Sequence, residues 1–138
     1  MSSENRRDIE TFRDLEVWQS AMRLVDRTYD LTRTLPEAER FGLVAQMRRS
    51  AVSIPSNIAE GFGRDSKWDV LRYVEMARGS LFELSTQAEV CLRQGSSTAF
   101  AQIIEDGEDL GRLLTAFMTA IRKWPERRRA SSRRPTND

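Results

Sequence analysis

Apolar side chains recur every three or four residues through four segments of the chain, and none of the segments shows the alternation of period two that is typical of strands. The segments cover residues 14–34, 41–60, 66–94 and 98–124. Proline or glycine follows the end of each segment, at Pro36, Gly61, Gly95 and Pro125, as is common at helix ends. Four helices joined by short connections predict an all-α fold, an up-down antiparallel four-helix bundle.

The first segment opens at Asp14, a plausible N-cap, and carries two adjacent apolar stripes. One stripe contains Leu15, Trp18, Met22, Val25, Tyr29 and Thr32, and the second contains Val17, Ala21, Leu24, Thr28 and Leu31. Together they form a face wider than one bundle core needs. Either the helix is deeply buried, or the second stripe packs against another subunit. We expect an oligomer interface that includes Val17, Trp18 and Leu24.

The second segment contains a proline inside its apolar pattern. Pro55 lacks the N–H that would bond to residue 51, and its ring clashes with that turn of a helix. A kink or a break into two helices would follow. The stripe at Val44, Met47, Ala51, Ile54 and Ile58 stays in phase across Pro55. The pattern therefore favours one helix kinked at Pro55.

The third segment opens near a Ser66-to-Asp69 capping box and holds Gly79 and Ser80 at its middle. Small residues at that point would let a neighbouring helix approach closely. Cys91 falls on the apolar side of the same segment, so we interpret it as a small core residue rather than a nucleophile.

A polar stripe runs beside the apolar stripe of the second segment. Its members are Gln46, Ser50, Ser53, Asn57 and Glu60. Three explanations remain open. The side chains bond to carbonyls freed around Pro55, or they form a buried network with Arg78, Ser80 or Glu83 of the third segment or with another subunit, or they bind a ligand or nucleic acid, with Arg48, Arg49 and Arg64 as phosphate contacts.

The composition excludes several classes of chemistry. The 138 residues include no histidine and one cysteine, which removes Ser-His and Cys-His catalysis, internal disulfides and the common zinc ligand sets. We expect no cofactor and no metal. A lone cysteine suits the reducing cytoplasm. No apolar run approaches the roughly 20 residues of a membrane span, and the opening residues do not resemble a signal peptide.

Charge is distributed unevenly along the chain. Residues 122–138 carry a net charge of +5, whereas the preceding 121 residues carry −4. We divide the chain into a flexible N-terminus at 1–11, a four-helix bundle at 12–124 and a basic disordered tail at 125–138. The tail either binds phosphates in RNA or DNA or serves only as a solubilising extension. Its candidate phosphate contacts are Arg127, Arg128, Arg129, Arg133 and Arg134.

One stretch of the second segment resembles a known family. It reads Ser53-Ile54-Pro55-Ser56-Asn57-Ile58-Ala59-Glu60-Gly61. Residues 12–18, 35–43, 46–52 and 77–84 extend the likeness to the bacterial four-helix-bundle proteins encoded in intervening sequences of 23S ribosomal RNA genes. The resemblance implies a homopentameric ring, and a similarity to the accessory variability protein of diversity-generating retroelements, a basic barrel that binds nucleic acid and a reverse transcriptase. The acidic body of this chain departs from that basic relative.

The sequence therefore leads us to expect a non-enzymatic homo-oligomeric scaffold or adaptor with weak, salt-dependent binding of RNA or DNA. The alternative is a protein-interaction bundle with no nucleic-acid role. Catalysis is disfavoured because Ser53 has no base partner at helical spacing, and Glu60 alone provides no mechanism. Histidine-dependent ribonuclease and di-iron arrangements are absent too.

Overall fold

The computed structural model describes residues 9–126, and four long helices dominate it. They are α2 (Glu16–Thr32), α3 (Ala45–Phe62), α4 (Lys67–Arg93) and α5 (Ala101–Arg122). Short helical turns precede them at η1 (Phe12–Asp14), η2 (Glu37–Glu39), η3 (Arg40–Val44) and η4 (Thr98–Phe100). The described range contains no strand, which confirms the all-α prediction. The tail arginines lie outside it, as do residues 1–8.

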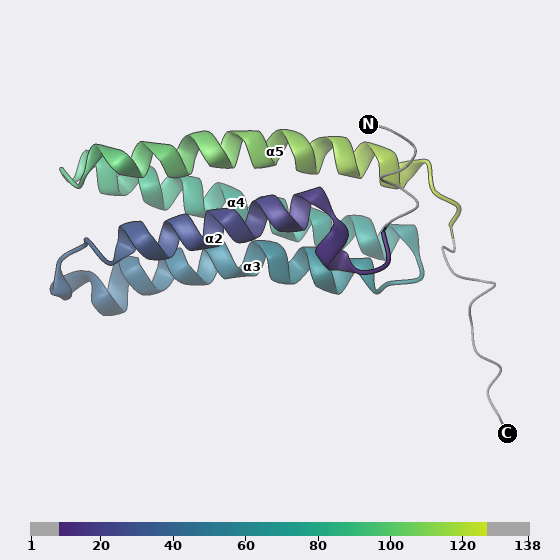
Figure 1. Cartoon of the computed structure of the whole chain (residues 1–138), viewed down its shortest axis with the longest axis horizontal. Helices are drawn as coiled ribbons and strands as arrows, with labels where there is room; N and C mark the ends of the chain where they lie inside the picture. The colour runs from purple at the N-terminus through teal and green to yellow at the C-terminus, as the bar shows by residue number, and fades with distance from the viewer. Residues whose placement is uncertain (1–8, 127–138) are drawn as a thin grey trace, which may run out of the picture.

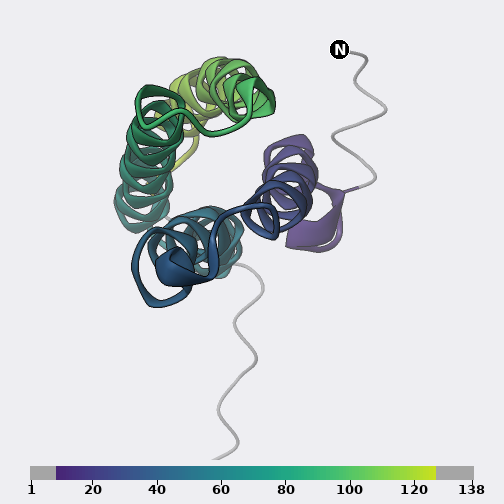
Figure 2. The same cartoon turned by 90° about the vertical axis from the view of Figure 1, so that its left-hand side faces the viewer.

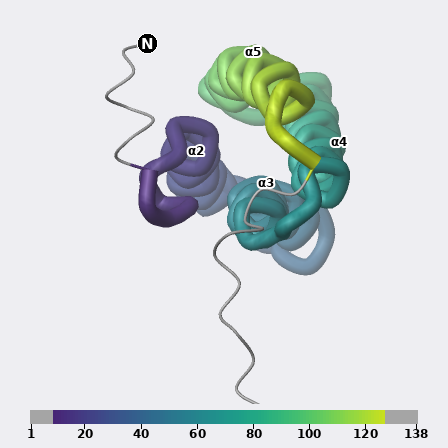
Figure 3. The backbone as a smooth tube through the Cα atoms, turned by 90° about the vertical axis from the view of Figure 1, so that its right-hand side faces the viewer, coloured from purple at the N-terminus to yellow at the C-terminus, as the bar shows by residue number. Residues whose placement is uncertain are grey.

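The four helices lie alongside one another (Figure 1), with the α2–α3 and α4–α5 connections at one end and the α3–α4 connection at the other. Seen end-on, α3 lies beside α2 and α4, and α4 lies between α3 and α5 (Figures 2 and 3). The α3–α4 contact is the most extensive, and the α2–α5 contact is the smallest of the four neighbouring pairs. The bundle is therefore tightest along α3 and α4.

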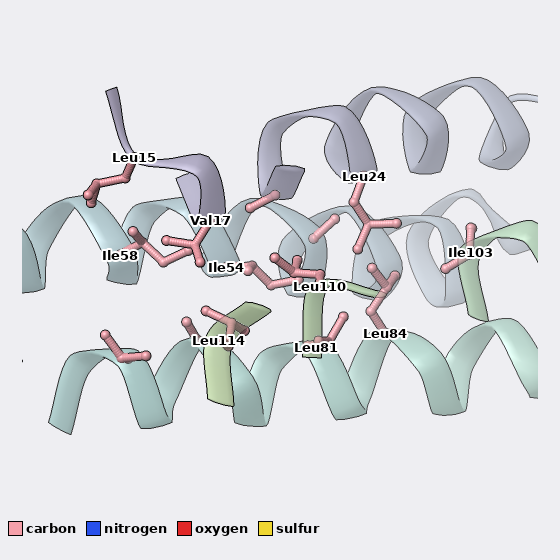
Figure 4. Close-up of a cluster of buried hydrophobic side chains, with 14 of the residues drawn as sticks. Leu15, Val17, Leu24, Ile54, Ile58, Leu81, Leu84, Ile103, Leu110 and Leu114 are labelled. Carbon is pink, nitrogen blue, oxygen red and sulfur yellow. The ribbon is translucent and has the colours of Figure 1, made fainter. Parts of the chain in front are cut away.

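One continuous apolar core fills the space between the helices. Leu24 of α2, Ile54 of α3, Leu81 of α4 and Leu110 of α5 meet near its centre (Figure 4), and each is at most 2% exposed. Burying a Leu or Ile side chain contributes roughly 1.5–3 kcal/mol. The apolar stripes predicted from the sequence supply this core.

Contacts within a single chain account for much of the wide apolar face of α2. Val17 and Leu24 of its second stripe are buried in the core, at 5% and 2% exposed. In the first stripe Leu15 and Thr32 are buried and the four residues between them are half-buried, and Arg48 of α3 lies 4.5 Å over the ring of Tyr29. Trp18 of that stripe meets the ring of Phe12 edge-on. Of the three residues predicted to form an oligomer interface, only Trp18 therefore keeps an accessible surface.

The backbone differs from the sequence expectation before α3. One helix runs through Pro55, whose ring is buried. A non-helical residue instead occurs at Gly42, with φ −98° and ψ −105°, where η3 leads into α3. A short helical turn after Pro36 was one of the two interpretations of the break between the first two segments, and it is observed as η2. The wider turn of η3 was not foreseen, because a single glycine inside an apolar pattern gives little warning of a change in helical pitch.

Asp14 does not cap α2, so that prediction is wrong. It is the third residue of η1, and its Oδ2 accepts the N–H groups of Glu10 and Thr11 at 2.9 and 3.0 Å. These two donors hold the pKa of the Asp14 carboxyl below its usual value. The N-cap of α2 is Leu15, whose own side chain is buried. Ser66 does cap α4, accepting the N–H of Trp68 at 3.3 Å.

A search of residues 9–126 finds no helix that combines the length and the apolar character needed to cross a bilayer.

The fold makes a specific prediction about two helical glycines. A Cβ added at Gly61 would lie 2.8 Å from Cβ of Tyr73, whereas one at Gly111 would lie at an ordinary 3.8 Å from the Leu81 side chain. We expect Gly61→Ala to lower the free energy of unfolding by about 1–3 kcal/mol, because overpacking strains the α3–α4 contact. Gly111→Ala should be neutral or stabilising by up to about 1 kcal/mol. Urea denaturation of both variants checks this, and equal effects would contradict it.

Candidate functional site

The middle of the polar stripe on α3 is bonded to α4. The hydroxyl of Ser50, which is 4% exposed, donates to Oε2 of Glu83 at 3.3 Å. The hydroxyls of Ser53 and Ser80 lie 2.8 Å apart. Two of the three partners proposed for an inter-helix network, Ser80 and Glu83, are therefore the partners observed. We call these two hydroxyl contacts the α3–α4 polar seam.

Asn57 bonds within its own helix. Its Nδ2 donates to the carbonyl oxygen of Ser53 at 2.8 Å and to the Ser53 hydroxyl at 3.0 Å. Ser56 donates similarly to the carbonyl of Val52 at 2.8 Å. The carbonyl that Pro55 leaves without its usual partner belongs to Ala51, four residues earlier. Side chains in this stretch therefore do donate hydrogen bonds to carbonyl oxygens one turn earlier in the helix. The acceptors are the carbonyls of Val52 and Ser53, and not the carbonyl of Ala51.

The two ends of the stripe are exposed. Gln46 faces solvent at one end. At the other end Glu60 pairs with Arg64 at 2.6 Å, and Arg64 also donates to the Tyr73 hydroxyl at 2.8 Å. Arg64 lies 4.9 Å over the same ring. Glu60, Arg64 and Tyr73 thus tie the end of α3 to α4. Sequence reasoning missed Tyr73, whose role depends on a contact nine residues away.

One buried polar atom on α4 lacks a partner within residues 9–126. It is Oε1 of Gln87. Gln87 lies one helical turn beyond Glu83, so it continues the side of α4 that carries Ser80 and Glu83 towards α3. Its sequence position gave no signal, because a glutamine between Thr86 and Ala88 does not indicate burial.

The three bundle arginines do not form one cluster. Sixteen residues separate Arg48 from Arg64, which corresponds to about 24 Å along a helix. Arg48 lies over Tyr29 and its Nε donates to the buried Thr32 hydroxyl at 3.0 Å. Arg49 is exposed and makes no hydrogen bond, ion pair or ring contact with other described residues. Two of the three predicted phosphate contacts therefore already have structural partners.

Two hollows lie outside the seam. An apolar groove of about 660 Å³ between α4 and α5 is lined by Leu81, Phe82, Ile104, Gly107 and Gly111, among others. Arg78, proposed as a partner of the polar stripe, lines this groove instead. A second hollow of about 480 Å³ at the α3–α4 connection is mostly polar and includes Arg64, Asp65 and Trp68. No three acidic or cysteine side chains in the described range are arranged to hold a metal ion.

Cys91 is a core residue, as predicted. It is 0% exposed, and its Sγ lies 3.7 Å from Sδ of Met47. Burial raises the pKa of the thiol, and the negative charge of Glu39 raises it further. At neutral pH the side chain is therefore a protonated thiol, which is a poor nucleophile.

The α3–α4 polar seam lies in the part of the chain that matches a known family. Residues 13–116 match the sequence model described as 23S rRNA-intervening sequence protein. The chain belongs to this family. The match covers α2, α3 and α4 completely and most of α5, so it spans nearly the whole bundle.

A solved structure has the same fold as this 23S rRNA-intervening sequence protein. It is the crystal structure of a protein of unknown function from the S23 ribosomal protein family of Bacteroides thetaiotaomicron, with a TM-score of 0.67. The two chains are 22% identical over 74% of this chain and 97% of the other. None of the curated proteins matches the chain.

The seam predicts an energetic coupling between two serines. Ser53→Ala and Ser80→Ala should each destabilise the protein, because each leaves one hydroxyl without its inter-helix partner. In the double variant, the loss should fall short of the sum of the single losses by about 0.5–1.5 kcal/mol. Urea denaturation of all four proteins measures this coupling. Additive losses would show that the two hydroxyls contribute independently.

Proposed function

We propose that this family member is a non-enzymatic homo-oligomeric scaffold, pentameric in its assembly, that binds RNA or DNA weakly through its basic tail. The carrying observation is the separation of charge along the chain. Residues 122–138 hold +5, and the rest of the chain holds −4. An acidic body repels a phosphate backbone, so attraction is concentrated in the tail.

The contacts of the bundle arginines support this assignment. Arg48 is held by Tyr29 and Thr32, and Arg64 is held by Glu60 and Tyr73. Moving either side chain to a phosphate would break these contacts. Arg49 stays available on the surface, but one exposed arginine contributes a single phosphate contact. The bundle therefore presents the tail rather than forming the main nucleic-acid surface.

Several tails in one assembly would bind nucleic acid more tightly than one weakly binding tail. Five tails in one ring would carry 25 formal positive charges, given +5 per copy. Once one tail is bound, the others bind at a high effective concentration. The sequence also resembles the accessory variability protein of diversity-generating retroelements. On that resemblance we propose that this protein binds a protein partner as well as nucleic acid.

Catalysis is not part of the proposal. The chain has no histidine. Ser53 shares a hydrogen bond with Ser80, and Glu60 pairs with Arg64, so neither is poised as a nucleophile or a general base. We also propose an up-down topology with a bend at Pro55, supported by the alternating ends of the connections in Figure 1 and by the missing N–H of proline. A cytoplasmic location suits the single protonated thiol.

A protein-interaction role without nucleic acid is the second candidate. It is favoured by four of the six large hydrophobic side chains that are exposed in the described range, because all four lie on α4. They are Trp68, Met76, Phe82 and Val90. Exposed apolar surface gathered on one element marks an interaction site.

Fluorescence anisotropy with structured RNA and duplex DNA tests the tail. We expect replacement of its five arginines by glutamine in the full chain to abolish most binding and to flatten the salt dependence. On duplex DNA, the slope of log K against log salt should fall by about 0.9 for each phosphate that the tail no longer neutralises. Arg49→Gln, the matched bundle control, should change the slope by the equivalent of about one phosphate at most.

Binding that survives replacement of all five tail arginines would place the site on the bundle and contradict the proposal. Absence of binding by the unaltered chain, at low salt as well as high, would leave the protein-interaction role as the better account.

A further inference from the structure

The chain that leads into the basic tail is fixed against the start of α4. The backbone N–H of Lys67 donates to the carbonyl oxygen of Glu126 at 3.2 Å, and its Nζ donates to the carbonyl oxygen of Arg122 at 2.8 Å. The end of α5 and the start of α4 lie at the same end of the bundle (Figure 3). Arg127, the first of the five tail arginines, directly follows Glu126 in the sequence. A nucleic acid bound by the tail is therefore brought to the start of α4.

The side chain that stands out at this point is Trp68. It lies in the first turn of α4 and is 57% exposed. The other two tryptophans of the chain, Trp18 and Trp124, are half-buried against the core. Nζ of Lys67 lies 4.8 Å over the indole ring of Trp68, so this ring already has a cation beside it. A large exposed aromatic ring thus lies next to the point where the basic tail begins.

The hollow beside Trp68 suits a base better than a phosphate. It has a volume of about 480 Å³, and three carboxylates line it, those of Asp65, Asp69 and Glu126. Among its lining residues only Arg64 is basic, and that side chain already has structural partners. Carboxylates repel a phosphate, but they accept hydrogen bonds from the amino group of a base such as cytosine.

Stacking is the contact that an exposed indole ring makes with nucleic acid. Every base has a flat π face, so an aromatic side chain stacks on any base that is turned out of its own stack. In a duplex both faces of each base are covered by its neighbours. A single strand therefore fits the ring of Trp68, and an intact duplex does not.

We propose that Trp68 stacks on an unpaired base of single-stranded nucleic acid held by the basic tail, with the amino group of the base facing the carboxylates of Asp69 and Glu126. This inference rests on the proposed function and adds to it the form of the nucleic acid. The tail supplies the attraction for phosphates, and Trp68 adds one uncharged contact. In an assembly of several copies, each chain brings its own Trp68 beside its own tail.

Fluorescence anisotropy with short oligo(rC), oligo(rU) and a duplex RNA of the same length tests the stacking. In the full chain, Trp68→Ala should weaken binding of oligo(rC) by about 5–150-fold, the range measured when one stacking side chain is removed. Binding of the duplex should not change. The slope of log K against log salt should also stay the same, because stacking releases no counterions. The unaltered chain should prefer oligo(rC) to oligo(rU), since uracil has no amino group.

Two further variants separate stacking from a general loss of apolar surface. Phe82→Ala removes another exposed aromatic ring of α4, 59% exposed and about 21 Å further along the helix. It should leave the binding of oligo(rC) unaltered. Trp68→Phe should keep most of the binding, because phenylalanine also stacks. The oligo(rC)-dependent quenching of tryptophan fluorescence, expected for the unaltered chain, should disappear in that variant.

Unchanged binding of oligo(rC) by Trp68→Ala would overturn the stacking and leave binding by the tail in place. An equal loss on the duplex, or tighter binding of oligo(rU) than of oligo(rC), would overturn it as well. Sedimentation equilibrium should give the same mass for Trp68→Ala and the unaltered chain, and a change of mass would assign Trp68 to a subunit contact instead. Failure of the proposed function is a different result, in which the unaltered chain binds none of the three RNAs and both proposals fall.

Discussion

The close approach of α3 and α4 is the constraint on which the rest of the structure depends. At one end Gly61 leaves no room for a side chain against Tyr73. In the middle, the hydroxyls of Ser53 and Ser80 lie 2.8 Å apart. Hydroxyls this close are satisfied by each other, so the seam loses little from burying them. The two helices form the most extensively packed pair, and α2 and α5 complete the core against it.

This pair also decides what the polar stripe can do. A ligand site needs polar groups that are free to turn outward. Ser50 and Ser53 instead form hydrogen bonds with side chains of α4, and Asn57 donates to a carbonyl of its own helix. Arg64 and Arg48 stabilise the edges of α3 in the same way. The polar chemistry of α3 thus holds the bundle together.

Much of the fold could be predicted from periodicity, because core positions depend on the pattern of one helix at a time. The four segments and the core position of Cys91 were accessible in this way. Ser80 and Glu83 were named only as possible partners, beside Arg78, within one of three open explanations. The helix ends were less accessible than the segments. Asp14 resembles an N-cap in sequence, but its carboxylate turns back to Glu10 and Thr11. Which backbone N–H groups bond to the Asp14 carboxylate depends on the path of the residues that precede it.

Features that depend on how helices meet were not predictable. Arg48, Arg49 and Arg64 looked like one group, but the rise of α3 separates Arg64 from the other two. Gly79 and Ser80 looked like one small-residue contact, but a single step along the helix turns them to different sides. Only the three-dimensional arrangement shows that Ser80 serves the inner contact and that Gly79 is left on the surface.

Native-state hydrogen exchange tests the central claim most directly, since it measures the free energy of opening at each amide. The account predicts that amides of α3 and α4 flanking Ser53 and Ser80 exchange only with global unfolding. Amides of α2, which makes the smaller contact with α5, should exchange through a lower-energy opening. If α3 and α4 instead open more easily than α2, the α3–α4 contact is not the foundation of the fold.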